Sequence, residues 1–108
     1  VPARVTGDRA IVTVGGVARE VRAVMPNGEA AGGSPYAVLR PDALEIVAPA
    51  SPGGWTGTIT ERRFAGALLA YRVKLAEDIE VEVHTTERGR EIGESVAVRV
   101  SREPVAVV

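Results

Sequence analysis

The sequence contains no cysteine, and this absence removes several kinds of chemistry at once. Disulfide bonds, thiolate nucleophiles and cysteine-ligated zinc sites are all excluded. Aromatic residues make up only 4% of the chain, so its core has to be built mainly from Val, Ala, Ile and Leu. The single histidine, His84, lacks partners at the spacing that a metal site or a catalytic triad needs. We therefore interpret His84 as a solvated residue at the end of a strand.

The chain also lacks a strong charge, a long apolar run and a nucleotide-binding motif. A formal net charge of −1 gives no field to attract nucleic acid or an anionic membrane surface. No apolar run approaches the roughly 20 residues that span a bilayer, so no direct membrane insertion is expected. None of the Gly-Gly pairs is followed by lysine, and the phosphate-binding pattern GxxxxGK[ST] is absent. We expect this chain to be no enzyme itself and to hold no cofactor.

What the sequence does have is a regular alternation of turn residues and β-branched runs. Glycine-rich turns recur along the whole chain, and runs of about four to eight residues rich in Val, Ile and Thr lie between them. This spacing predicts an all-β fold of short antiparallel strands, with at most one short helical turn within Pro41–Val47. The predicted strands are Ala3–Val5, Ala10–Val14, Val17–Val24, Tyr36–Arg40, Glu45–Val47, Trp55–Arg63, Ala70–Leu75, Ile79–His84, Ser95–Ser101 and Val105–Val108.

A length of 108 residues predicts a single domain, 1–108. Two long loops rich in Gly, Pro, Ala and Ser are predicted, Met25–Pro35 and Ala48–Gly54. The second marks a seam between two sub-elements, roughly 1–47 and 55–108. Because the chain opens with a strand-like segment and no initiator Met, we expect it to be a piece of a longer protein.

One hairpin is specific enough to predict its register. A three-residue loop, Ala76-Glu77-Asp78, places apolar residues opposite one another on one face and opposite charges on the other. A slip by one residue would set charged side chains against apolar ones, so the alternation fixes the pairing. The predicted pairs are Leu75 with Ile79, Val73 with Val81, Tyr71 with Val83, Lys74 with Glu80 and Arg72 with Glu82.

Few residues are candidates for contacts with a partner. The segment Arg40-Pro41-Asp42 would end a strand, because proline stops the hydrogen-bond ladder and Asp42 can accept hydrogen bonds from nearby amides; the alternative is a partner-contact edge. Trp55 is interpreted as a contact residue or a lid over the core. Phe64 is interpreted as a core residue rather than a binding platform. No catalytic, cofactor-binding or metal-binding residue is predicted.

Two sequence segments, in this order along the chain, resemble motifs of a known family. The first is Tyr36–Ile46, in which an apolar residue, Arg, Pro and an acid follow one another before a strand. The second, Gly57–Gly66, reads Gly-Thr-apolar-x-Glu-x-x-aromatic-x-Gly and is followed by a hairpin. Together they resemble the TOBE domain, the transport-associated OB-like module at the C-terminal end of the ATPase subunits of many ABC importers.

The resemblance implies a fold, a setting and a role. The fold would be an OB-like small antiparallel barrel of TOBE type. The chain would be a non-catalytic accessory and regulatory domain, with ATP and Mg²⁺ bound in a nucleotide-binding domain that precedes Val1. Its partners would be a second copy of the ATPase subunit and, through the parent chain, permease subunits. It would be cytoplasmic, peripheral on the inner face of the cell membrane.

Two other functions stay open. One is a small oxyanion-binding barrel of the molybdate type, which would hold its ligand on backbone amides and small polar side chains. That family's Ser-Ala-Arg-Asn opening is absent here. The other is an OB-type module for single-stranded nucleic acid, which would need a basic groove and stacking aromatics. One Trp, two Tyr, one Phe and a pI of about 5.9 argue against it.

Overall fold

The computed structural model describes residues 1–24 and 35–107, and it confirms an all-β fold. Within these residues the only helical element is one 3-10 turn, η1 (Pro41–Ala43), inside the segment predicted to hold a helical turn. No helix in this part of the chain is long and apolar enough to cross a membrane. The strands are β1 (Ala3–Thr6), β2 (Arg9–Val14), β3 (Val17–Val24), β4 (Ala37–Val38), β5 (Leu44–Val47), β6 (Trp55–Ala65), β7 (Leu68–Ala76), β8 (Ile79–Thr85), β9 (Ser95–Val100) and β10 (Val105–Val107).

All ten predicted strands are present, and most ends differ by one or two residues. The predicted strand Tyr36–Arg40 is the one that the structure shortens most, because only β4 forms a regular strand there. Of the predicted loop Met25–Pro35 only Pro35 lies among the described residues, and Val108 lies outside them.

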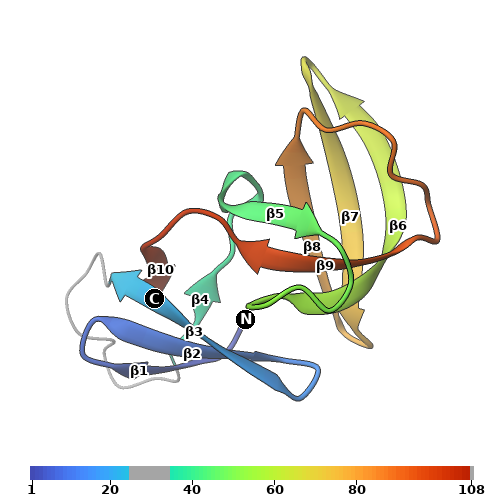
Figure 1. The fold of residues 1–108 in the computed structure, drawn as a ribbon. Helices are drawn as coiled ribbons and strands as arrows, with labels where there is room; N and C mark the ends of the chain where they lie inside the picture. The colour runs from blue at the N-terminus through green and yellow to red at the C-terminus, as the bar shows by residue number, and fades with distance from the viewer. Residues whose placement is uncertain (25–34, 108) are drawn as a thin grey trace.

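The strands form two five-stranded sheets, drawn in the lower left and upper right of Figure 1. The first has the order β1-β2-β3-β10-β4 and the second the order β5-β9-β6-β7-β8. The pair β3–β10 is parallel, whereas the other pairs in both sheets are antiparallel. The sheets do not follow the predicted seam, because β5 pairs with β9 and β10 pairs with β3 and β4. The single domain and its sub-elements 1–47 and 55–108 stay predictions.

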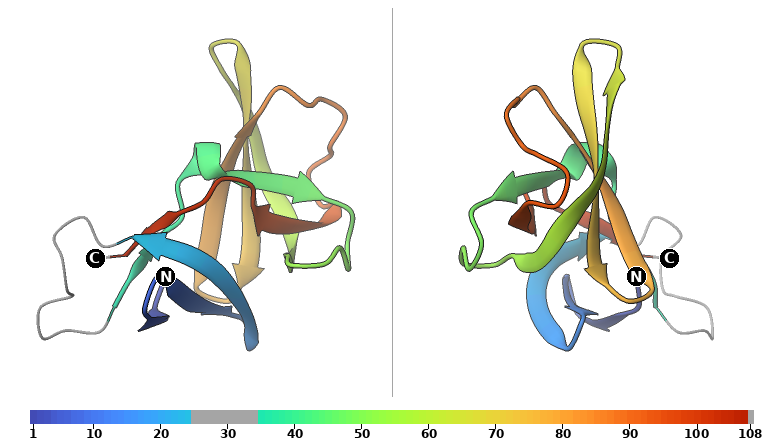
Figure 2. Two further views of the ribbon diagram at one scale, coloured as in Figure 1. Left: turned by 60° about the vertical axis from the view of Figure 1, so that its left-hand side comes forward. Right: turned by 90° about the vertical axis from the view of Figure 1, so that its right-hand side faces the viewer.

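The second sheet curls into a nearly closed barrel. Its two end strands, β5 and β8, lie close to each other. Figure 2 shows the long, twisted β6–β7 hairpin, which forms part of the barrel sheet and projects beyond it at one end. Gly57 permits the close approach of these two strands, because a Cβ added there would lie 2.5 Å from the carbonyl oxygen of Lys74. The barrel core is aliphatic apart from one tyrosine: Leu44, Ile46, Ile59, Leu69, Tyr71, Val73, Val81, Val83, Val96 and Val98.

The first sheet has a core of its own, built from small and β-branched residues and one tryptophan of the second sheet. Three partly buried residues, Leu39, Leu75 and Val100, pack against both cores and so join the two sheets. The members of this core are Ala10, Val12, Val14, Val21, Ala37, Trp55, Val105 and Val107.

The predicted β7–β8 register is confirmed at four of its five positions. Tyr71 with Val83, Arg72 with Glu82, Val73 with Val81 and Lys74 with Glu80 all lie opposite each other. The fifth pair was wrong: Ala76, not Leu75, pairs with Ile79, and a bulge interrupts the register. The bulge leaves Leu75 partly buried between the two cores, a packing role that the strand alternation alone does not reveal.

On the charged face of the barrel, ion pairs join β6 to both β7 and β8, in addition to the predicted pairing between β7 and β8. Arg72 on β7 lies 3.3 Å from Glu61 on β6, and Glu82 on β8 lies 2.9 Å from Arg63 on β6. Because most of these side chains are half exposed, each pair contributes on the order of 1 kcal/mol or less. The pairs help to set strand order more than they stabilise the fold.

Candidate functional site

The predicted motif Arg40-Pro41-Asp42 lies where the chain passes from the first sheet to the second. Pro41 opens the 3-10 turn η1, for which its fixed φ is suited, and the amide of Ala43 donates to the carbonyl of Arg40 at 3.0 Å. The Asp42 carboxylate lies 3.6 Å from Nε of Arg40, and both side chains are exposed. We find no backbone amide donating to Asp42 within residues 1–24 and 35–107, so that part of the prediction was wrong. The short turn places the carboxylate beside Arg40.

The same turn is tied to the connection between β9 and β10. The carbonyl of Ala43 accepts hydrogen bonds from the amides of Ser101, at 2.8 Å, and Arg102, at 3.3 Å. Two segments far apart in the sequence are therefore held side by side at the junction of the two sheets.

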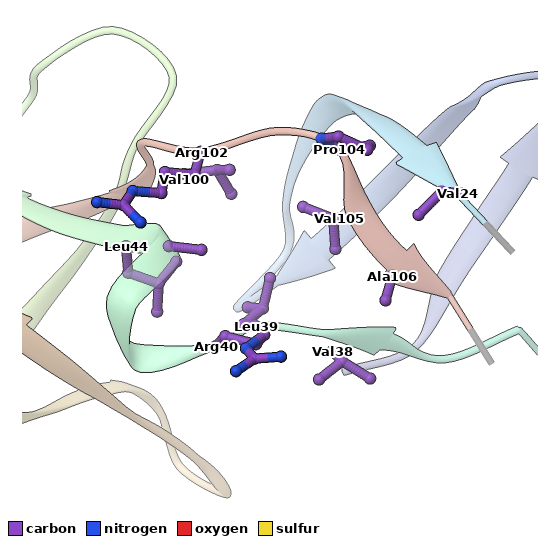
Figure 3. Close-up of a pocket in the computed structure, with 11 residues that line it drawn as sticks. Val24, Val38, Leu39, Arg40, Leu44, Val100, Arg102, Pro104, Val105 and Ala106 are labelled. Atoms are coloured by element: carbon purple, nitrogen blue, oxygen red, sulfur yellow. The ribbon is translucent and has the colours of Figure 1, made fainter. Parts of the chain in front are cut away.

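A pocket of about 210 Å³ lies at this junction. Figure 3 shows its lining residues coming from both sheets, with the head of Arg102 near Val100 and Leu44 and the head of Arg40 near Leu39. Within the described part of the chain no carboxylate lies at ion-pair distance from Arg102, whereas Arg40 has Asp42. The lining is Val24, Val38, Leu39, Arg40, Ala43, Leu44, Val100, Arg102, Pro104, Val105 and Ala106.

Trp55 lies in the core, not on an accessible contact surface. It begins β6 and is 2% exposed. Its indole Nε1 donates to the carbonyl of Val17 on β3 at 3.0 Å, and Nε of Arg19 donates to the carbonyl of Gly54 at 3.1 Å. Arg19 lies on the same strand face as the apolar residues Val17 and Val21. Its hydrogen bond to the carbonyl of Gly54 gives the charged side chain a partner on that face. The two bonds fasten β3 to the start of β6.

Phe64 is on the surface, so the core interpretation of this residue was wrong. Its side chain is 72% exposed, and the Cζ atom of Arg88 lies 5.8 Å from the ring centroid. Phe64 pairs with Leu69 near the end of the β6–β7 hairpin, the part that projects beyond the barrel. Tyr71, placed deeper on β7, is fully buried and donates its hydroxyl to the carbonyl of Glu87 at 3.3 Å.

The candidate residues thus lie in three separate places: the motif at the pocket, Trp55 between the sheets, and Phe64 near the hairpin end. Sequence reasoning missed Arg102. Its only signal is a short polar stretch, 101–103, between two apolar strands near the chain end.

Two ion-pairing or hydrogen-bonding side chains outside the pocket complete the site description. His84 is half buried, with its Nε2 2.8 Å from the Glu82 carboxylate, so it is less solvated than predicted. Arg90 donates to Glu94 at 2.9 Å; this bond and one from the amide of Glu91 lower the pKa of Glu94. Among the described residues no cluster of three or more His, Asp or Glu side chains could hold a metal ion.

Comparison with known proteins decides the family. The family model described as the TOBE domain matches residues 37–108. This chain belongs to the TOBE domain family. No curated protein matches the chain. The family match includes the motif Arg40-Pro41-Asp42, the whole barrel and strands β4 and β10 of the first sheet, whereas β1, β2 and β3 precede it.

Proposed function

We propose that this TOBE domain is the C-terminal accessory and regulatory domain of the ATPase subunit of an ABC importer. The family match over two thirds of the chain carries the proposal, since TOBE domains are typical of that position. The absence of a GxxxxGK[ST] motif from the sequence agrees with a domain that contributes no ATP site of its own. ATP and Mg²⁺ would bind in the nucleotide-binding domain of the parent chain.

The mechanism we propose is coupling rather than catalysis. The domain would contact a second copy of the ATPase subunit at the cytoplasmic face of the membrane, beside the permease subunits. Contacts that form in only one of the open and closed states of the dimer would shift the balance between them, and with it the rate of the ATPase cycle. The coupling would depend on the surface of a β-domain that is held together by two packed cores.

Two experiments test this function in sequence. Mass spectrometry of the native gene product should find peptides upstream of Val1, among them one with GxxxxGK[ST]. In the parent transporter, deletion of residues 1–108 should then change how substrate stimulates ATP hydrolysis. A variant of the nucleotide-binding motif lysine serves as control, because it should abolish hydrolysis itself. ATPase and transport rates that are unchanged by the deletion would contradict a regulatory role.

A further inference from the structure

We propose that the pocket between the two sheets binds a small organic anion, with its apolar body inside and its anionic group at Arg102. This site is additional to the proposed role in an ABC importer and does not depend on it. The proposal stands on three observations: the chemistry of the lining, the size of the pocket and its place at the junction.

The lining is apolar except for two arginines. Nine of its eleven residues are Val, Leu, Ala or Pro, and none of the eleven carries a hydroxyl, amide or carboxylate group. Such walls bind hydrocarbon well but leave most oxygens of a bare inorganic oxyanion without hydrogen-bond donors. Both charged groups are guanidinium groups, which match the geometry of a carboxylate.

Arg102 is the better anion partner of the two. Asp42 already lies 3.6 Å from Arg40, and an incoming anion would have to compete with that carboxylate. For Arg102 the described residues provide no such competitor. Arg102 also lies in the segment whose amide is held on the carbonyl of Ala43, so the backbone beneath its side chain is fixed.

The size of the pocket limits the ligand. A volume of about 210 Å³ is far above the roughly 10–15 Å³ that one water molecule needs, and below the roughly 300–1,000 Å³ typical of drug-sized ligands. It suits a short carboxylate of about eight non-hydrogen atoms. For a ligand of this size we expect a dissociation constant on the order of a millimolar.

Because the pocket lies at the junction of the two sheets, ligand binding there should stabilise the folded domain. Leu39 and Val100 line the pocket and also pack against both cores. A ligand there would touch both sheets at once. Since it binds the folded chain and not the unfolded one, it should raise the melting temperature of the domain as its concentration increases.

An NMR titration of the 108-residue chain with 4-methylpentanoate tests the proposal. We expect saturable shifts in the amides of 39–44 and 100–106, with weaker binding, by about 5-fold or more, of the uncharged 4-methylpentan-1-ol. Sulfate and molybdate should neither cause these shifts nor displace the carboxylate. Equal affinity for the alcohol, or no saturable shift at these amides, would overturn the proposal. Displacement by molybdate would also overturn it and would favour the oxyanion-binding alternative.

Matched variants separate the site from general effects. Arg102→Gln should weaken binding of 4-methylpentanoate by about 5-fold, because an exposed charge-assisted hydrogen bond is lost. Arg88→Gln, an exposed arginine outside the pocket lining, should leave it unchanged. Ala43→Leu should fill the pocket and abolish binding, with an otherwise native spectrum showing that the variant folds. Equal effects of the two arginine variants would show non-specific attraction to positive charge and refute the site.

Discussion

Replacing Trp55 tests whether one buried indole holds the two sheets together. Trp55 belongs to a strand of the barrel sheet, is 2% exposed and lies within the core of the other sheet. Truncating a large buried aromatic to alanine costs about 3–5 kcal/mol. Trp55→Phe keeps a ring but loses the 3.0 Å hydrogen bond to the carbonyl of Val17, so we expect about 1–2.5 kcal/mol. Against a typical stability of about 5–15 kcal/mol, the alanine variant should lose a large share.

Urea unfolding followed by far-UV circular dichroism measures these costs without relying on the fluorescence of the deleted residue. Phe64→Ala is a matched control, because Phe64 is an aromatic residue on the same strand but is 72% exposed. It should change the free energy of unfolding by no more than about 0.5 kcal/mol. The reasoning is refuted if Trp55→Ala costs less than about 1 kcal/mol, or no more than Phe64→Ala.

Three further predictions concern the barrel. Gly57→Ala should cost about 1–3 kcal/mol in urea unfolding, because the new Cβ would lie 2.5 Å from the carbonyl oxygen of Lys74; a neutral result would contradict the close strand approach. Glu94→Gln should destabilise the chain at neutral pH but not in acid. The hydrogen bond from Arg90 lowers the pKa of Glu94. The stabilisation by the ionised Glu94 is therefore fully present above the usual carboxyl pKa and is lost as the pH falls through the lowered pKa of Glu94. Stability curves for both proteins that stay parallel down to acid pH would rule this out. Exchanging Lys74 and Glu80 together should cost less than reversing either alone, with a coupling of about 0.2–1 kcal/mol in a double-mutant cycle; additive losses would contradict the register.

The strands and one register could be predicted because they depend on local information. Alternation of apolar and charged residues places Val73 opposite Val81 and Lys74 opposite Glu80, and a one-residue slip would expose the apolar set. Turn residues between β-branched runs located all ten strands in the same way. The motif Arg40-Pro41-Asp42 was found for a similar reason, since proline restricts the backbone wherever it stands.

Features that depend on distant contacts could not be predicted. The alternation of β6 and β7 does not say how far the hairpin projects past the barrel, and so does not separate exposed Phe64 from buried Tyr71. The bulge near Leu75 lets this side chain pack against both cores, and the local alternation does not show that a second sheet lies there to receive it. Arg102 lies at the pocket in a segment that is hydrogen-bonded to η1, about 60 residues away, and the local sequence does not show this contact.

The boundary of the family match has a consequence for the pocket and for the fold. Strand β10 lies inside the match, yet one of its two neighbours is β3, which precedes it. Without residues 1–24, β10 would pair only with the two-residue β4. Four members of the core of the first sheet would be missing, and Trp55 would lose the carbonyl of Val17 to which it donates. One wall of the pocket, at Val24, would also be absent. We therefore infer that the matched range does not close its own core, and that the folding unit and the pocket both require the strands that come before it.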